Sequence, residues 1–228
     1  MDADAARRRL TMSAHGPASL FADISSNDSA FNAHAYRSAG HRVIAIKATE
    51  GVSFTNPHYA AWVAAAHAAG LAVIHYHFCR PENLAPIGQA DHFWNTVAPH
   101  YHHGPDRLAL DLETGHPNSV AGWLATSDAH LHDRSGETPV AYTYLSYLNE
   151  AGGALKIGSK RWWIAAWGNQ SPPAKLPGGQ QLWAWQNTDG RLGGDPKRHA
   201  GVIGSAPGGG GDGSILNRRS LGLMLAQL

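Results

Sequence analysis

The chain is poor in cysteine. Among its 228 residues only Cys79 is a cysteine, which excludes an internal disulfide and a zinc cluster built from several cysteines. A fold without disulfides works in a reducing cytoplasm and also outside the cell, so the compartment stays open. Long apolar runs are lacking too: none approaches the roughly 20 residues of a membrane-spanning helix, and we expect no membrane span.

Charge is scarce and balanced. Charged residues make up 15% of the chain, with 18 Lys and Arg against 17 Asp and Glu. Because the net charge is close to zero, the composition gives no reason to expect nucleic acid or an anionic membrane as a partner. The 15 histidines would make the surface more cationic at mildly acidic pH, which favours contact with anionic cell walls.

The N-terminal residues carry no recognisable signal peptide. Arg7, Arg8 and Arg9 are not followed by the apolar segment that a secretory signal requires. We expect residues 1–15 to form a disordered tail and residues 16–228 to form a single domain. The glycine run 208–211 predicts a loop near the end of that domain and not a domain boundary.

Short apolar runs alternate with helical or loop-like stretches along the chain. The runs predicted as strands are 20–24, 41–47, 71–78, 107–112, 139–144, 161–167, 181–186 and 214–216. The stretches predicted as helices are 59–69, 87–97 and 120–131. Alternation of this kind indicates a parallel sheet buried on both faces. About eight strands favour a closed α/β barrel of TIM type over a doubly wound open sheet, since no glycine-rich phosphate loop follows the first strand.

Two carboxylates stand at the end of one apolar strand, in Leu-Asp-Leu-Glu with Asp111 and Glu113 as the acids. Side chains two residues apart on a strand share a face, and the carboxyl ends of barrel strands form the active site. Glycoside hydrolysis needs such a pair, one group to protonate the leaving oxygen and one to support the sugar centre. Asp23, which ends the first strand, would meet them at the same rim. Without other evidence, the pair is also explained by a helix N-cap followed by an acidic first turn, and Asp23 by a turn-forming or capping aspartate.

Aromatic residues gather near the predicted strand ends, where their flat faces suit the apolar faces of sugars. They are Tyr76, Tyr142, Tyr144, Trp167, Trp183 and Trp185, and ordinary core packing explains about half of such residues. His75 and His77 share a strand face and raise the alternative of a zinc hydrolase. No later histidine ends an apolar strand, and His102 and His103 are adjacent in a loop, where neighbouring side chains diverge. We therefore expect hydrogen-bonded histidines and no metal.

Taken in order, several short segments resemble glycoside hydrolase family 25, the Chalaropsis-type lysozymes common among bacteriophage endolysins. The matching segments are 21–25 (FADIS), 46–51 (IKATEG), 69–71 (AGL), 76–78 (YHF), 89–93 (QADHF), 110–113 (LDLE), 141–144 (AYTY), 163–165 (WIA) and 185–186 (WQ). Their ordered succession spans roughly residues 19–217.

The resemblance implies an irregular TIM-like (β/α)5(β)3 barrel in a single domain and a peptidoglycan hydrolase that needs no cofactor. The family cleaves the β-1,4 bond between N-acetylmuramic acid and N-acetylglucosamine, and Glu113 matches its general acid, with Asp111 and Asp23 in support. The residues expected to bind substrate are Tyr76, Tyr142, Trp167, Trp185, Glu50 and Asp212. The implied partner is bacterial peptidoglycan. The implied protein is a monomer, phage-encoded and released to the cell wall or otherwise exported.

Two positions depart from the family pattern. The family usually has an aspartate two residues before an asparagine on the last strand, where this chain has Ile215 before Asn217. Asp212, from the glycine-rich loop, is the candidate substitute. Asn56 stands where the family often has aspartate. The missing aspartate keeps open a catalytically weakened wall-binding protein as an alternative, beside the metal hydrolase centred on His75 and His77.

Overall fold

The computed structural model describes residues 20–115, 117–151, 160–167, 172–177, 180–188, 203–204, 212–216 and 224. The expected tail 1–15 and the glycine run 208–211 lie outside the described residues. Among the helices within these ranges, none has the length and apolar character that crossing a bilayer requires.

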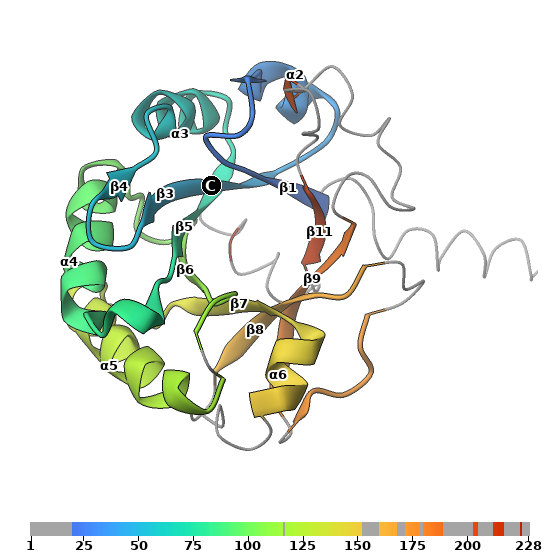
Figure 1. The fold of residues 1–228 in the computed structure, drawn as a ribbon. Coiled ribbons are helices and arrows are strands. Elements are labelled where there is room, and N and C mark those ends of the chain that lie inside the picture. The colour runs from blue at the N-terminus through green and yellow to red at the C-terminus, as the bar shows by residue number, and fades with distance from the viewer. Residues whose placement is uncertain are drawn as a thin grey trace, which may run out of the picture.

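Within the described residues, eight strands close into a barrel (Figure 1). They are β1 (Leu20–Ile24), β3 (Val43–Glu50), β5 (Ala72–Phe78), β6 (Arg107–Asp111), β7 (Val140–Tyr144), β8 (Arg161–Ala165), β9 (Gln181–Thr188) and β11 (Asp212–Leu216). Neighbours from β3 to β9 pair in parallel, and β1 pairs in parallel with β3. β11 is antiparallel to both β9 and β1, which closes the ring. The expected barrel of five β/α units followed by strands is confirmed.

Helices lie outside the barrel wall (Figure 1). They are α2 (Ala33–Ser38), α3 (Tyr59–Ala68), α4 (Pro86–Val97), α5 (Pro117–Ser135) and α6 (Leu145–Ala151). The short 3-10 helices are η3 (Pro81–Asn83) and η4 (Ala98–His100), and the short strands are β2 (Ala30–Phe31), β4 (Phe54–Thr55) and β10 (Ile203–Gly204). α3 ends before Gly70, whose φ of 72° is the left-handed conformation that glycine adopts without strain.

Some boundaries differ from the sequence-based expectation. β3 continues to Glu50 because its last residues pair with both β4 and β5, a tertiary effect that apolar patterning does not register. β8 ends at Ala165, so Trp167 follows the strand and is 46% exposed. α2 and α6 have only 6 and 7 residues, too few for a helical period to emerge. α2 follows a capping residue, Asn32, whose side chain accepts a 3.0 Å hydrogen bond from the Ala35 N–H.

The hydrophobic core has two layers because strand side chains alternate between the barrel interior and the helices. On β6, Leu108 and Leu110 belong to the outer layer and Ala109 to the inner one. The inner layer combines small residues with large rings such as Phe21 and Trp163, whose centroids lie 5.1 Å apart. The next inward position on β6 after Ala109 is Asp111, at the carboxyl end of the strand.

Candidate active site

Asp111 is the last residue of β6 and is 7% exposed. In the sheet register it stands between Phe78 of β5 and Tyr142 of β7. Its Oδ1 atom is buried and accepts no hydrogen bond from the described residues. Glu113, two residues further on, is half-buried. The two acids therefore lie at the carboxyl end of the barrel. The more buried of them, Asp111, has a carboxyl oxygen, Oδ1, with no hydrogen-bond partner among the described residues.

The two carboxyl groups hold a proton more strongly than isolated acids do. Burial raises the pKa of Asp111 well above its usual range, and the charge of Glu113 raises it further, while Lys47 opposes the shift. Burial also raises the pKa of Glu113, against a hydrogen bond with the Tyr142 side chain and the charge of Lys47. Because like charges this close cannot both ionise readily, the proton belongs to the pair and not to Glu113 alone.

Gln186 connects three of the expected site residues. Its Oε1 accepts hydrogen bonds from the Tyr142 hydroxyl and the Trp167 indole N–H, both at 2.8 Å. Its Nε2 donates to Asp23 Oδ2 at 3.1 Å. An indole N–H only donates, which fixes the orientation of the amide. Tyr142 in turn bonds Glu113, so Asp23 is joined to the carboxylate pair through Gln186 and Tyr142.

Sequence reasoning did not assign Gln186 a role. The signal was present, because Gln186 is two residues after Ala184, an inner-layer residue on the same strand. A buried glutamine, 1% exposed, at the inward end of an apolar strand needs partners for its amide. The register that supplies those partners is a tertiary property.

A group of ion-paired side chains, Lys47, Glu50 and Arg80, lies beside the carboxylate pair at the ends of β3 and β5. Glu50 accepts from Lys47 Nζ at 2.6 Å and from Arg80 Nε at 2.9 Å. Lys47 Nζ and the Arg80 guanidinium each lie 4.8 Å from the centre of the Phe78 ring. Burial raises the pKa of Glu50, but the hydrogen bonds from the two cations outweigh it and leave the pKa below its usual value.

Glu50 therefore stays ionised and holds two cations in place. Those cations, Lys47 and Arg80, also lower the pKa of Asp111. Neither was singled out from the sequence. Lys47 had a signal, since it lies two residues after the inner-layer residue Ala45 on the same strand.

The remaining expected residues divide between the site and the core. Tyr76 is half-buried against the inner layer, in register with Lys47 and Ala109. Asp212 stands opposite Asp23 in the β11–β1 pairing, at the same end of the barrel. Trp185 does not join the group: it is buried in the outer layer, and its indole donates to the Ala166 carbonyl at 3.1 Å.

His75 and His77 also lie away from the carboxylates, in positions that alternate with the inner-layer residue Ile74. The ring nitrogens of His75 contact the Tyr59 hydroxyl at 2.7 Å and Asp106 Oδ2 at 3.1 Å. Those of His77 contact Thr49 Oγ1 at 2.8 Å and Gln89 Oε1 at 3.2 Å.

Burial lowers the pKa of His77 to about 4, so this ring is neutral at ordinary pH. Both rings use both nitrogens within the protein, as expected for structural histidines. The geometry gives no support to a metal hydrolase centred on them.

Asn56, at the second departure from the family pattern, has a local structural role. Its Nδ2 donates to the Lys47 carbonyl at 2.8 Å, and its Oδ1 accepts from the His58 N–H at 3.0 Å. These bonds shape the turn between β4 and α3. The side chain is 2% exposed and has no contact with the carboxylate pair among the bonds described.

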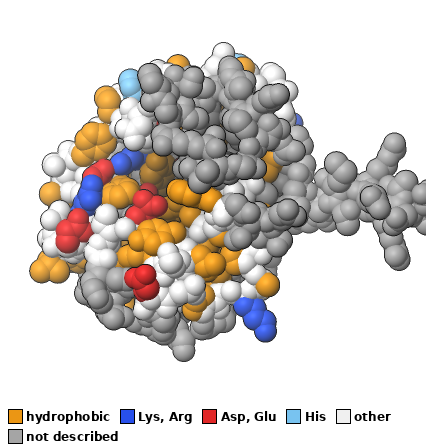
Figure 2. Space-filling view, turned by 45° about the vertical axis from the view of Figure 1, so that its right-hand side comes forward, with side chains coloured by type: hydrophobic (Ala, Val, Ile, Leu, Met, Phe, Trp, Pro, Cys, Tyr) orange, Lys and Arg blue, Asp and Glu red, His pale blue; other side chains and the backbone are white. Residues whose placement is uncertain are grey.

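The molecular surface is hollowed where acidic and hydrophobic side chains meet (Figure 2). Acidic side chains lie within the hollow, hydrophobic side chains frame it, and basic side chains stand beside further acids at one side. A hollow with apolar walls and buried carboxyl groups suits a sugar chain, whose faces are apolar and whose cleavage requires acid catalysis.

Comparison with known proteins identifies the family of the chain. The family model described as glycosyl hydrolases family 25 matches residues 22–194. The N,O-diacetylmuramidase of a Chalaropsis species is 31% identical over 189 residues, covering 73% of this chain and 86% of the relative. Lysozyme M1 of Streptomyces globisporus is 29% identical over 189 residues, covering 75% of this chain and 63% of the relative.

Solved structures show the same fold. A bacterial lysozyme from Streptomyces coelicolor superposes with a TM-score of 0.74 at 23% identity, covering 92% of this chain and 98% of that one. A family GH25 lysozyme from Aspergillus fumigatus gives a TM-score of 0.72 at 24% identity, covering 87% of this chain and 93% of that one. On the family match, the sequence relatives and the shared barrel, this chain belongs to glycosyl hydrolase family 25.

Proposed function

We propose that this chain is a muramidase that cleaves the β-1,4 bond between N-acetylmuramic acid and N-acetylglucosamine in bacterial peptidoglycan, with Glu113 as general acid. The observation that carries the proposal is the pair of proton-retaining carboxyl groups, Asp111 and Glu113, at the carboxyl end of the barrel. A general acid must be protonated at working pH, and burial beside a second acid provides that condition.

The two acids have different surroundings and therefore different proposed roles. Glu113, the less buried, gives its proton to the leaving glycosidic oxygen as the C1–O bond breaks. Asp111 keeps a buried acceptor, Oδ1, without a partner among the described residues. If the carboxyl group turns toward the cleft, this oxygen can accept the acetamido N–H of the substrate and so aim the acetamido oxygen at C1. That oxygen bonds to C1, and water, deprotonated by Glu113, then displaces it with net retention.

The surrounding residues hold this arrangement. Gln186 fixes the Tyr142 hydroxyl and the Trp167 indole, and the half-exposed Trp167 offers a flat face for a sugar ring. Asp212 pairs with Asp23 in the β11–β1 register, which supports the proposal that it serves as the family's fourth acid and that the chain is an active enzyme and not a weakened wall-binding protein. We further propose that the chain acts as a monomer at the bacterial cell wall, reached by phage release or by export.

Glu113→Gln tests the assignment. Glutamine is nearly isosteric but cannot donate the proton, and acid catalysis usually contributes about 10²–10⁴-fold. We expect at least about a 100-fold loss in the rate of reducing-end release from purified walls, with an unchanged melting temperature. Glu150→Gln on α6, where the side chain is exposed, is the matched control and should retain full activity. Retention of more than about a tenth of the activity by Glu113→Gln would refute the role.

A further inference from the structure

A second group of titratable side chains lies at the opposite end of β6 from the active site. Asp106 immediately precedes that strand, whereas Asp111 ends it. The Asp106 carboxylate is fully buried. Its Oδ1 accepts from the Val73 N–H at 2.9 Å, and its Oδ2 accepts from the His102 N–H at 2.9 Å and contacts His75 Nε2 at 3.1 Å. Three groups thus hold the carboxylate in one orientation.

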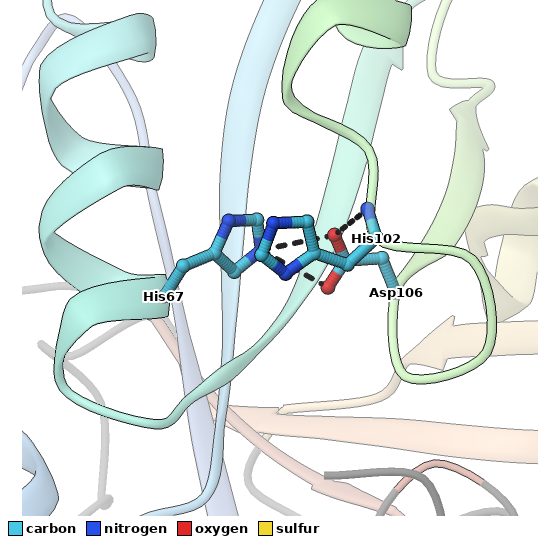
Figure 3. A group of neighbouring side chains, drawn as sticks. All are labelled: His67, His102 and Asp106. Carbon is cyan, nitrogen blue, oxygen red and sulfur yellow. Dashed lines mark hydrogen bonds and ion pairs between the residues drawn. The ribbon is translucent and has the colours of Figure 1, made fainter.

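Two further imidazoles lie near this carboxylate on its outer side, and one of them, His67, contacts it (Figure 3). His67, in the last turn of α3, places Nε2 at 3.0 Å from Asp106 Oδ2 and 3.3 Å from Oδ1. The His102 ring stacks on the His67 ring, with centroids 3.7 Å apart and planes 14° apart. One atom of each residue lies within 4.8 Å of the other two. His102 is exposed, so the group opens to solvent.

We propose that His67, His102 and Asp106 form a binding site for a zinc-like transition metal ion. Two imidazole nitrogens and a carboxylate oxygen are the donor set that zinc takes, at about 2.0–2.2 Å per bond. At such bond lengths, the observed separations of 3.0 and 3.3 Å between His67 Nε2 and the Asp106 oxygens correspond to angles of about 90–105° at the ion. The ion would replace the proton of the hydrogen bond between His67 and Asp106.

The surrounding contacts suit this role. The Asp106 carboxylate is oriented by hydrogen bonds with the Val73 N–H, the His102 N–H and the His75 ring. Metal ligands require hydrogen-bonding partners of this kind. Imidazole lone pairs lie in the ring plane, so His102 must turn out of its stack to aim a nitrogen at the ion. Its exposure leaves room for that turn and for a water molecule in the fourth position. The bound ion would tie α3 to the segment before β6.

The test is calorimetric titration of the full chain with zinc chloride at about pH 7.5, because binding of zinc to histidine competes with protons and weakens in acid. His102→Asn removes one ligand at an exposed position, and His103→Asn is its matched control in the adjacent residue. We expect one zinc per chain in the wild type and His103→Asn, and at least about tenfold weaker binding in His102→Asn. Zinc should raise the melting temperature of the wild type and of His103→Asn more than that of His102→Asn.

Activity on cell walls should be the same in all three proteins, because the site lies at the far end of β6 from Asp111. Zinc affinity that is equal in the wild type and His102→Asn would overturn the proposal, as would an equal loss in both variants or no binding at all. These outcomes are independent of the muramidase assignment, since neither variant alters the carboxylate pair.

Discussion

The Tyr142 hydroxyl offers a way to move the pKa of the catalytic pair without touching either acid. Its single proton is donated to Gln186 Oε1 or, when Glu113 is ionised, to the Glu113 carboxylate, and the second bond lowers the pKa of that carboxyl group. Tyr142→Phe removes the hydroxyl but keeps the ring, whose centroid lies 4.8 Å from that of Trp163. A hydrogen bond to the charged form favours that form, so its loss must raise the pKa of Glu113.

The size of the effect follows from the bond that is lost. A hydrogen bond to a charged group contributes about 1.5–3 kcal/mol, and about 1.4 kcal/mol corresponds to one pKa unit. Glu113 is only half-buried and shares its proton with Asp111, so solvent and coupling reduce the effect, and we expect the alkaline limb of the pH–rate profile to move by roughly 0.5–1 pH unit. Gln186 Oε1 keeps its bond from Trp167, so we expect a stability loss of about 1 kcal/mol, or a melting temperature lower by about 2–4 °C.

The assay is the initial rate of reducing-end release from purified walls, measured from acidic to mildly alkaline pH. Because the acid keeps its proton to higher pH in Tyr142→Phe, the alkaline limb of the profile should move upward. Tyr144→Phe, where the side chain is 37% exposed, is the control and should leave the limb in place. An alkaline limb that stays fixed or moves downward in Tyr142→Phe would refute the reasoning.

Three further predictions concern neighbouring residues. Asp23→Asn keeps an oxygen for Gln186 but removes a negative charge, so the alkaline limb should move downward; an unmoved limb with unchanged melting would leave Asp23 without a role in the pair. Trp167→Ala should raise KM about two- to tenfold with a smaller change in kcat, and an unchanged KM would argue against a sugar platform. Burial raises the pKa of Asp106, but hydrogen bonds from His67 and His75 outweigh it and lower the pKa below its usual value. Its stabilising effect is therefore present above the unfolded pKa of about 3.9 and is lost progressively as the pH falls from there through the lower folded pKa, and melting of Asp106→Asn should depend less on acid pH than that of the wild type.

The barrel and the position of the acids were predictable because both follow from local patterns. Short apolar runs separated by helices indicate a barrel, and alternation along β6 places Asp111 on the inward face at the carboxyl end. Asp23 follows from the same reasoning on β1. These inferences require only that a segment is predicted as a strand and that its carboxyl end is known.

Residue pairings between strands were not predictable in the same way. Trp185 was expected at the site, yet its neighbour Gln186 faces Asp23 and Trp185 faces the outer layer. A shift of one residue exchanges the two faces of a strand, and the sequence alone does not fix which face is inward. The bond between Glu50 and Arg80 joins residues 30 positions apart, and only the β3–β5 register brings them together.

Mass spectrometry of the fragments released from purified walls tests the central claim most directly. After borohydride reduction, each new chain end carries the reduced form of the sugar whose bond was cut. A muramidase leaves N-acetylmuramic acid at that end, and we predict reduced muramic acid in the wild-type digest, at levels at least about 100-fold lower with Glu113→Gln. Reduced N-acetylglucosamine ends, or freed stem peptides with intact glycan strands, would contradict the account.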